Sequence, residues 1–250
     1  MTHLIGDIGN TKTKLCILDK KSKIIKRLNI ETSKIKNQYY FKKIIFSFVK
    51  DRIVNKKALF CSVVPPVFFV IKKSFKKYLN IQCQELKQTH YSKIIKIKAK
   101  KKQIGSDRIA NAIGSYYTYK SDCIVLDFGT ATTFDVINRG TYLGGIIAPG
   151  VNLSLSTLIK RADLIPPFTI KKINKVVGNN TLSALRSGFY WGYAGMIENI
   201  LRLIKKETKR SYIIILTGGY SSLFKNSIKS KVFIDEDITM KGLIELLRVK

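Results

Sequence analysis

The chain has 250 residues, 45% of them hydrophobic, which is enough apolar content for one large domain or two smaller ones. It has no apolar run of about 18 residues and no basic-then-apolar start, so we expect no membrane span, no signal peptide and a cytoplasmic location. The formal net charge is +30. Because the lysines are spread along the whole chain, we attribute the charge to overall composition and expect no nucleic-acid partner.

The four cysteines are dispersed, at Cys16, Cys61, Cys83 and Cys123. A disulfide or zinc framework would need close pairs, so we expect buried, reduced thiols. His3 and His90 are far apart in sequence with no Cys or carboxylate cluster beside them. We therefore assign neither histidine a role as a metal ligand.

In chain order, residues 2–30 predict three strands with a turn at 19–23. Residues 37–50 predict an amphipathic helix, because large apolar residues recur there at helical spacing. A buried strand at 58–64 precedes a helix from Pro65 to about Tyr78. This order, β-β-β-α-β-α, is that of a ribonuclease-H-like domain. The alternating Ile and Lys residues of 91–98 predict an edge strand.

A helix should begin near residue 106 and run through Tyr117, with Ser106 or Asp107 as its N-cap. The second half then repeats the same order. It has a hairpin from 124 to 135, a strand at 141–148 and a helix at 151–161. An irregular connection at 163–175 leads to a long helix at 181–206, a strand at 212–216, a helix, a strand at 232–234 and a last helix from 240.

This duplication predicts an α/β fold of two ribonuclease-H-like domains, residues 1–118 and 119–250. Each domain should contain a mixed five-stranded sheet flanked by helices, as in actin-like ATPases. We expect a nucleotide-binding cleft between the two domains.

The most informative stretch is residues 127–135, Asp-Phe-Gly-Thr-Ala-Thr-Thr-Phe-Asp, which follows an apolar strand. Glycine allows close backbone approach, and hydroxyl and turn N–H groups can donate to phosphate oxygens. Asp127 is placed to hold a cation that neutralises the phosphates. The alternative interpretation is an ordinary glycine-containing hairpin with no role in binding. We do not count Asp135, at the end of this stretch, among the candidate catalytic residues.

The same pattern occurs near the start of the chain, where Asp7-Ile8-Gly9-Asn10-Thr11 follows an apolar strand and precedes an alternating one. Each half of the chain therefore contains one hairpin that carries a carboxylate. Two such hairpins facing each other across a cleft would suit a metal–nucleotide complex.

Six motifs resemble those of type III pantothenate kinases, in the same order and at similar spacing over nearly the whole chain. They are Asp7-Ile8-Gly9-Asn10-Thr11, Gly105-Ser106-Asp107-Arg108, the segment from Asp127 to Thr132, the segment from Gly144 to Gly150, Gly178-Asn179-Asn180-Thr181, and Thr217-Gly218-Gly219. The resemblance implies a homodimeric enzyme of the sugar kinase, actin and 70-kDa heat-shock superfamily. Such enzymes use ATP to phosphorylate pantothenate to 4'-phosphopantothenate, the first step of coenzyme A biosynthesis.

By this resemblance, Asp107 is the general base that accepts the proton of the attacking hydroxyl, and Arg108 pairs with substrate or phosphate charge. A helix start is expected to lower the pKa of Asp107 and keep it ionised. Asp7 would bind Mg²⁺ through water, and Asp127 would bind a monovalent cation, K⁺ or NH₄⁺. The nucleotide would be bound by Gly9, Asn10, Thr11, Thr13, Lys14, Thr130, Thr132, Gly218 and Gly219.

The resemblance also implies a set of substrate-binding residues, namely Gly105, Ser106, Asp107, Arg108, Gly145 and Thr181. Thr181 would act across the dimer interface. Two alternatives stay open here: Lys14 as an ordinary solvated lysine, and Thr181 as the N-cap of the long helix.

One segment departs from the family pattern. Upstream of Gly105 the family carries an aromatic residue and a proline that touch pantothenate, whereas this chain has Lys98 to Gln103. A kinase of the same fold with another small hydroxyl acceptor is therefore one alternative, and a non-catalytic nucleic-acid-binding regulator is another. Retention of Asp7, Asp107, Arg108 and Asp127 together argues against the regulator.

Overall fold

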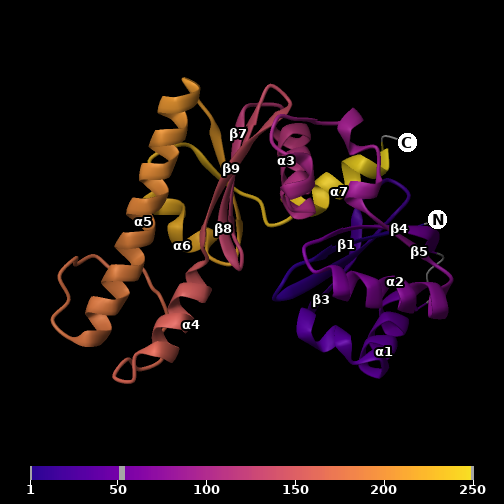
Figure 1. Cartoon of the computed structure of the whole chain (residues 1–250), viewed down its shortest axis with the longest axis horizontal. Helices are drawn as coiled ribbons and strands as arrows, with labels where there is room; N and C mark the ends of the chain where they lie inside the picture. Colours follow the sequence, from indigo (N-terminus) through magenta and orange to yellow (C-terminus); the bar gives the residue numbers. More distant parts are fainter. Residues whose placement is uncertain (1, 51–53, 249–250) are drawn as a thin grey trace. The chain divides into compact units, whose positions relative to one another are not determined.

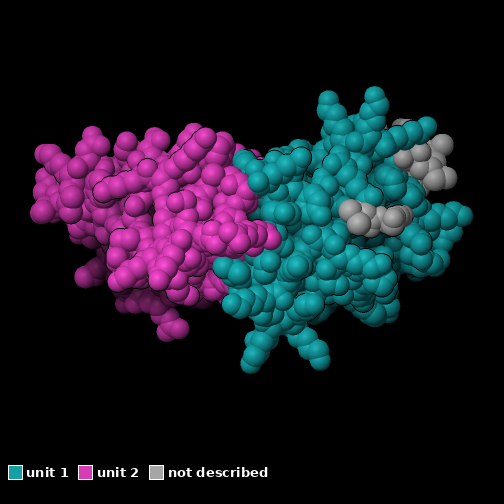
Figure 2. Space-filling model, turned by 90° about the horizontal axis from the view of Figure 1, so that it is seen from above, with its two compact units in different colours: residues 1–120, 140–143, 237–250 teal, residues 121–139, 144–236 magenta. Residues whose placement is uncertain are grey.

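The computed structural model describes residues 2–50 and 54–248. The chain divides into two compact units (Figure 2). Unit 1 comprises residues 1–120, 140–143 and 237–250, and unit 2 comprises residues 121–139 and 144–236. Within the described ranges, no helix is long and apolar enough to cross a bilayer.

The sheet of unit 1 has five strands in the order β3-β2-β1-β4-β5. Their bounds are β1 Thr2–Ile8, β2 Lys12–Leu18, β3 Ile24–Glu31, β4 Val54–Ser62 and β5 Gln82–Glu85. The pairs β1–β2 and β2–β3 are antiparallel, whereas β1–β4 and β4–β5 are parallel. The three N-terminal strands and the following buried strand are confirmed. The sequence did not predict β5, because Cys83 is its only apolar residue and the other three residues are polar.

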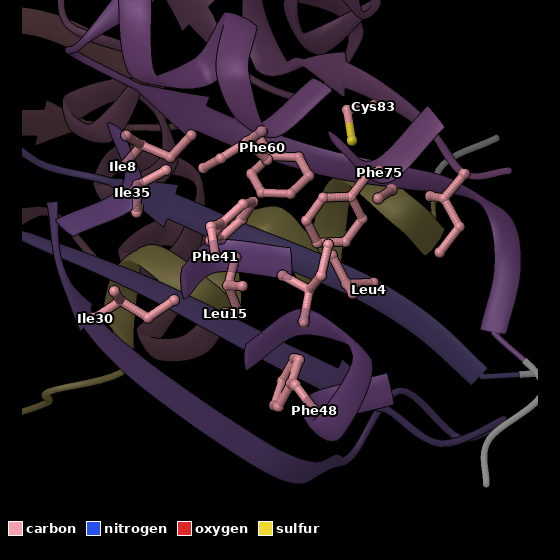
Figure 3. Packing of buried hydrophobic residues seen from close by; sticks show 14 of the residues in the cluster. Leu4, Ile8, Leu15, Ile30, Ile35, Phe41, Phe48, Phe60, Phe75 and Cys83 are labelled. Carbon is pink, nitrogen blue, oxygen red and sulfur yellow. The ribbon is translucent and has the colours of Figure 1, made fainter. Parts of the chain in front are cut away.

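Helices cover both faces of this sheet (Figure 1). On one face lie α1 (Gln38–Val49) and α2 (Pro65–Leu79), and on the other α3 (Ser106–Tyr119) and α7 (Ile238–Arg248). The core between the sheet and α1 and α2 contains Phe41, Phe60 and Phe75 (Figure 3). The ring of Phe75 lies 6.2 Å from that of Phe41 and 6.0 Å from that of Phe60. Burial of these rings stabilises the strands that carry the first hairpin.

Helix α7 belongs to unit 1, although the expected second domain, 119–250, includes it. It packs against α3 at two glycines, where the helix backbones come close. A methyl group at Gly114 would overlap the backbone of Ile238, and one at Gly242 would overlap that of Ala110. The chain therefore returns to its first unit after completing the second.

The second sheet has the order β11-β10-β7-β8-β9-β6. Its strands are β7 Cys123–Phe128, β8 Ala131–Asn138, β9 Thr141–Pro149, β10 Ile213–Gly218, β11 Val232–Ile234 and β6 Lys96–Ile97. The run β9-β8-β7-β10-β11 repeats the order of the first sheet, as the duplication predicts. The sheet has six strands, not five, because the two-residue edge strand β6 pairs with the start of β9. The rest of 91–98 does not form the expected strand, since Tyr91–Lys93 is a 3-10 turn.

The helices of unit 2 are α4 (Val151–Arg161), α5 (Thr181–Thr208) and α6 (Ser221–Phe224). The expected long helix is confirmed, and the irregular connection expected at 163–175 is confirmed and continues to residue 180. The Phe224 ring stacks on Phe128 at 5.4 Å and on Tyr190 at 5.9 Å. This aromatic stack fixes α5 and α6 to the strand that delivers the central hairpin.

Candidate active site

The first hairpin is formed by β1 and β2. Its turn is closed by a hydrogen bond from Gly9 N to Lys12 O at 3.0 Å. Asp7 is half-buried near the end of β1, with Lys14 opposite it on β2 and Cys61 opposite it on β4. This register places a cation across from the carboxylate, which favours a role for Lys14 beyond that of a solvated lysine.

Cys61 contributes a thiol to this carboxylate. Its Sγ lies 3.4 Å from Asp7 Oδ1 and donates to it. Burial, followed by the nearby charges of Asp7 and Asp107, raises the pKa of this thiol well above its ordinary value, so it stays protonated. Cys61 is buried as expected, but its contact with Asp7 was not predicted. The usable signal was its place at the end of a parallel strand, where functional side chains collect.

The hydroxyls predicted to bind phosphate on this hairpin differ in exposure. Asn10 and Thr11 are exposed at the turn. Thr13 is fully buried, and its hydroxyl lies 3.0 Å from that of Thr32, which in turn donates to Gly9 O at 2.7 Å. Thr13 therefore supports the turn from inside.

Helix α3 begins at Ser106 with Gly105 as its N-cap and without a side-chain cap, so the expected capping by Ser106 or Asp107 is wrong. Ser106 is instead buried against the end of β4. Its hydroxyl accepts from Ser62 N at 2.7 Å and donates to Ser62 O at 3.0 Å. These two bonds fix the start of α3 to the strand that carries Cys61.

Asp107 lies in the first turn of α3, and its Oδ1 accepts the backbone N–H of Arg108 at 2.8 Å. Burial raises the pKa of this carboxyl above its ordinary value, although the backbone N–H and the charge of Arg108 both lower it. The expectation of a lowered pKa is therefore wrong, because desolvation outweighs the helix start. Asp7, Cys61, Ser106 and Asp107 thus gather at the carboxyl end of β4.

In unit 2, Asp127 is half-buried near the end of β7 and pairs with Thr217 on β10. Gly218 follows with φ +86, a left-handed conformation that favours glycine. A methyl group there would lie 2.8 Å from Asp127 Oδ1 and 2.6 Å from Phe128 O. Close approach of strand β10 to this carboxylate therefore requires glycine.

The central turn is exposed at Gly129 and Thr130, and the backbone of Gly150 packs directly on it. Thr132 is fully buried, and its hydroxyl has no hydrogen-bond partner among the described residues. In the register of β7 and β8, Thr132 pairs with Phe128 and Asp127 pairs with Thr133, so the Thr132 hydroxyl and the Asp127 carboxylate lie on opposite faces of the sheet.

No group of three or more His, Cys, Asp or Glu side chains in the described part of the chain could hold a metal. A divalent ion at Asp7 would therefore share its coordination with phosphate oxygens and water, which is the usual arrangement for Mg²⁺. The half-buried carboxylate of Asp7 is an oxygen ligand of the kind that Mg²⁺ takes, so it fits this arrangement.

The N-cap of α5 is Asn180, which forms a capping box with Ser183, so the N-cap interpretation of Thr181 is wrong. Ser183 N donates to Asn180 Oδ1 at 2.9 Å. Thr181 is exposed at the rim of an apolar cavity of about 580 Å³ between α4 and α5, lined also by Leu158 and Phe189. Gly145 is exposed on β9.

A family model described as "Type III pantothenate kinase" matches residues 3–203. The Pelagibacter ubique protein named type III pantothenate kinase is 56% identical over 241 residues, 96% of each chain. Its Paramagnetospirillum magneticum namesake is 36% identical over 200 residues, 79% of this chain and 77% of that one. A Streptomyces griseus ROK family glucokinase, solved with glucose and AMPPNP, has the same fold with a TM-score of 0.56 and 12% identity over all of both chains.

Proposed function

The chain belongs to the type III pantothenate kinase family, and we infer that it transfers the γ-phosphoryl group of ATP to pantothenate, giving 4'-phosphopantothenate for coenzyme A biosynthesis. The observation that carries the assignment of residues is the position of Asp107. Its carboxylate accepts the backbone N–H of Arg108 in the first turn of α3. The start of this helix is fixed to β4 by the hydrogen bond between Ser106 and Ser62.

In this proposal Asp107 accepts the proton of the pantothenate hydroxyl as that oxygen attacks the γ-phosphorus. The phosphoryl group passes to the hydroxyl oxygen, the bond to the β-phosphate oxygen breaks, and ADP leaves with its electron pair. A raised pKa makes Asp107 a stronger base than an ordinary aspartate. Arg108 supplies positive charge beside it.

Two cations complete the proposed site. Asp7 would hold Mg²⁺ through water, with Lys14 beside it, and Asp127 would hold K⁺ or NH₄⁺. When bound, these ions neutralise phosphate charge. Asn10, Thr11 and the turn at Thr130 would donate to phosphate oxygens, and Gly218 and Gly219 would lie beside the adenosine.

We further propose that the protein is a cytoplasmic homodimer joined through α5. Methyl groups at Gly188 and Gly192 would meet nothing within 4 Å, so these small residues are not explained by packing within the chain. They line the apolar cavity beside Thr181. A second copy covering this face would bury it and bring Thr181 of the partner subunit to the substrate. Sedimentation of a species of twice the chain mass supports this, and a monomer at micromolar concentration contradicts it.

Incubation of the purified protein with MgATP, K⁺ and a panel of small hydroxyl compounds tests the activity, with phosphorylated products identified by mass spectrometry. Phosphopantothenate as the main product supports the proposal. Phosphorylation of another compound in its place would favour the alternative acceptor, for which Lys98 to Gln103 is the motivation. Without any kinase activity, DNA binding that persists above about 0.2 M salt would favour the regulator.

A further inference from the structure

Two adjacent residues at the carboxyl end of β4 contact the unit 1 site, one at Asp7 and the other at the residue that precedes Asp107. Cys61 donates its thiol to Asp7 Oδ1 at 3.4 Å. Ser62 exchanges two hydrogen bonds with Ser106, the residue before Asp107. The second contact fixes the start of α3, which carries Asp107. The first contact has no such explanation, because nothing in the proposed chemistry uses the Cys61 thiol.

The geometry of the thiol is set by the sheet. Asp7 and Cys61 are paired in the parallel register of β1 and β4, so their Cα atoms are fixed by the strand hydrogen bonds. Cys61 is 0% exposed, so its thiol reaches the carboxylate from the protein interior, while Asp7 itself is half-buried. The second acceptor near Sγ, Gly6 O, lies farther away at 3.9 Å.

A carboxylate at a strand end can adopt several side-chain rotamers, and a nucleotide-bound cation selects one of them. A donor fixed behind one oxygen restricts that choice before the ligand arrives. We propose that Cys61 is a positioning residue, whose thiol holds the carboxylate of Asp7 in the orientation that receives the hydrated Mg²⁺ of MgATP. This rests on the proposed function of Asp7.

The test compares Cys61→Ala with Cys83→Ala. Cys83 is also buried in this sheet, but it lies on β5 and pairs with Ala58, away from Asp7. Binding of a fluorescent ADP analogue is measured at fixed concentration while Mg²⁺ is varied, and urea unfolding is measured in parallel. We expect Cys61→Ala to need about fivefold more Mg²⁺ for half-maximal binding. Cys83→Ala should keep the wild-type midpoint despite a similar loss of stability.

Two further variants separate the possible failures. Cys61→Ser keeps a donor and should stay within about twofold of the wild-type midpoint. Asp7→Asn should lose most of the Mg²⁺ dependence of nucleotide binding. If Asp7→Asn keeps it, the assignment of Mg²⁺ to Asp7 fails. If Asp7→Asn loses the Mg²⁺ dependence but Cys61→Ala has the same Mg²⁺ midpoint as wild type or Cys83→Ala, only the proposed role of Cys61 is overturned.

Discussion

Replacing Gly105 with alanine should displace the general base while leaving the fold intact. Gly105 has φ −59 and ψ 141, which alanine adopts without strain. The added methyl group would, however, overlap Asp107 Oδ1. That oxygen would have to move by about 1 Å to restore van der Waals separation. Because a misplacement of about 1 Å can cost about 100-fold in rate, we expect a loss of that size in kcat.

The assay is pantothenate-dependent ADP release at saturating substrates, with urea unfolding as the control for folding. The free energy of unfolding should change by less than about 1 kcal/mol. Repeating the substitution in an Asp107→Ala background removes the atom that the methyl group displaces, so Gly105→Ala should there cost less than about twofold. An equal loss in both backgrounds, or no loss in the wild-type background, would refute the reasoning.

Four other predictions concern Asp107, the contact between α3 and α7, and the ion pair of Arg27. Burial raises the pKa of Asp107, so kcat/KM should begin to fall, as the pH is lowered, at a pH above the ordinary aspartate pKa of about 3.9. A profile of kcat/KM that stays flat down to that pH would contradict this. The raised pKa means that the ionised Asp107 lowers stability at neutral pH. Asp107→Asn should therefore unfold at higher urea than wild type at pH 7, with the gain lost as the pH falls through that pKa. Gly242→Ala should lower the free energy of unfolding by about 3 kcal/mol or more, measured by urea unfolding, because its methyl group would overlap the backbone of Ala110. Arg27 donates to Asp237 Oδ2 at 2.7 Å, and this hydrogen bond lowers the pKa of Asp237. Arg27→Ala should therefore lower the free energy of unfolding by less than about 1 kcal/mol at pH 7. Thermal melts should show that this difference from wild type disappears as the pH falls through the lowered pKa.

Local patterns predicted most of the elements. The alternation around Leu15 and the helical spacing of Phe41 and Phe48 are properties of short windows, and the structure has a strand and a helix there. The two Asp-x-Gly turns were visible for the same reason. Their repetition also predicted that both sheets share one strand order.

The features that were missed depend on contacts between distant parts of the chain. Nothing near Gly242 indicates that α7 packs on α3, because the close approach involves residues more than a hundred positions earlier. The contact of Cys61 with Asp7 exists only through the pairing of β1 with β4. The direction of the pKa change at Asp107 was wrong because sequence shows the helix start but not the burial.

The central claim is that Asp107 is the base for phosphoryl transfer to pantothenate. The most direct test is the turnover of Asp107→Asn in pantothenate-dependent ADP release, with nucleotide binding measured on the same preparation. We predict a kcat at least about 100-fold below wild type with nucleotide affinity retained. Wild-type turnover by Asp107→Asn would contradict the account.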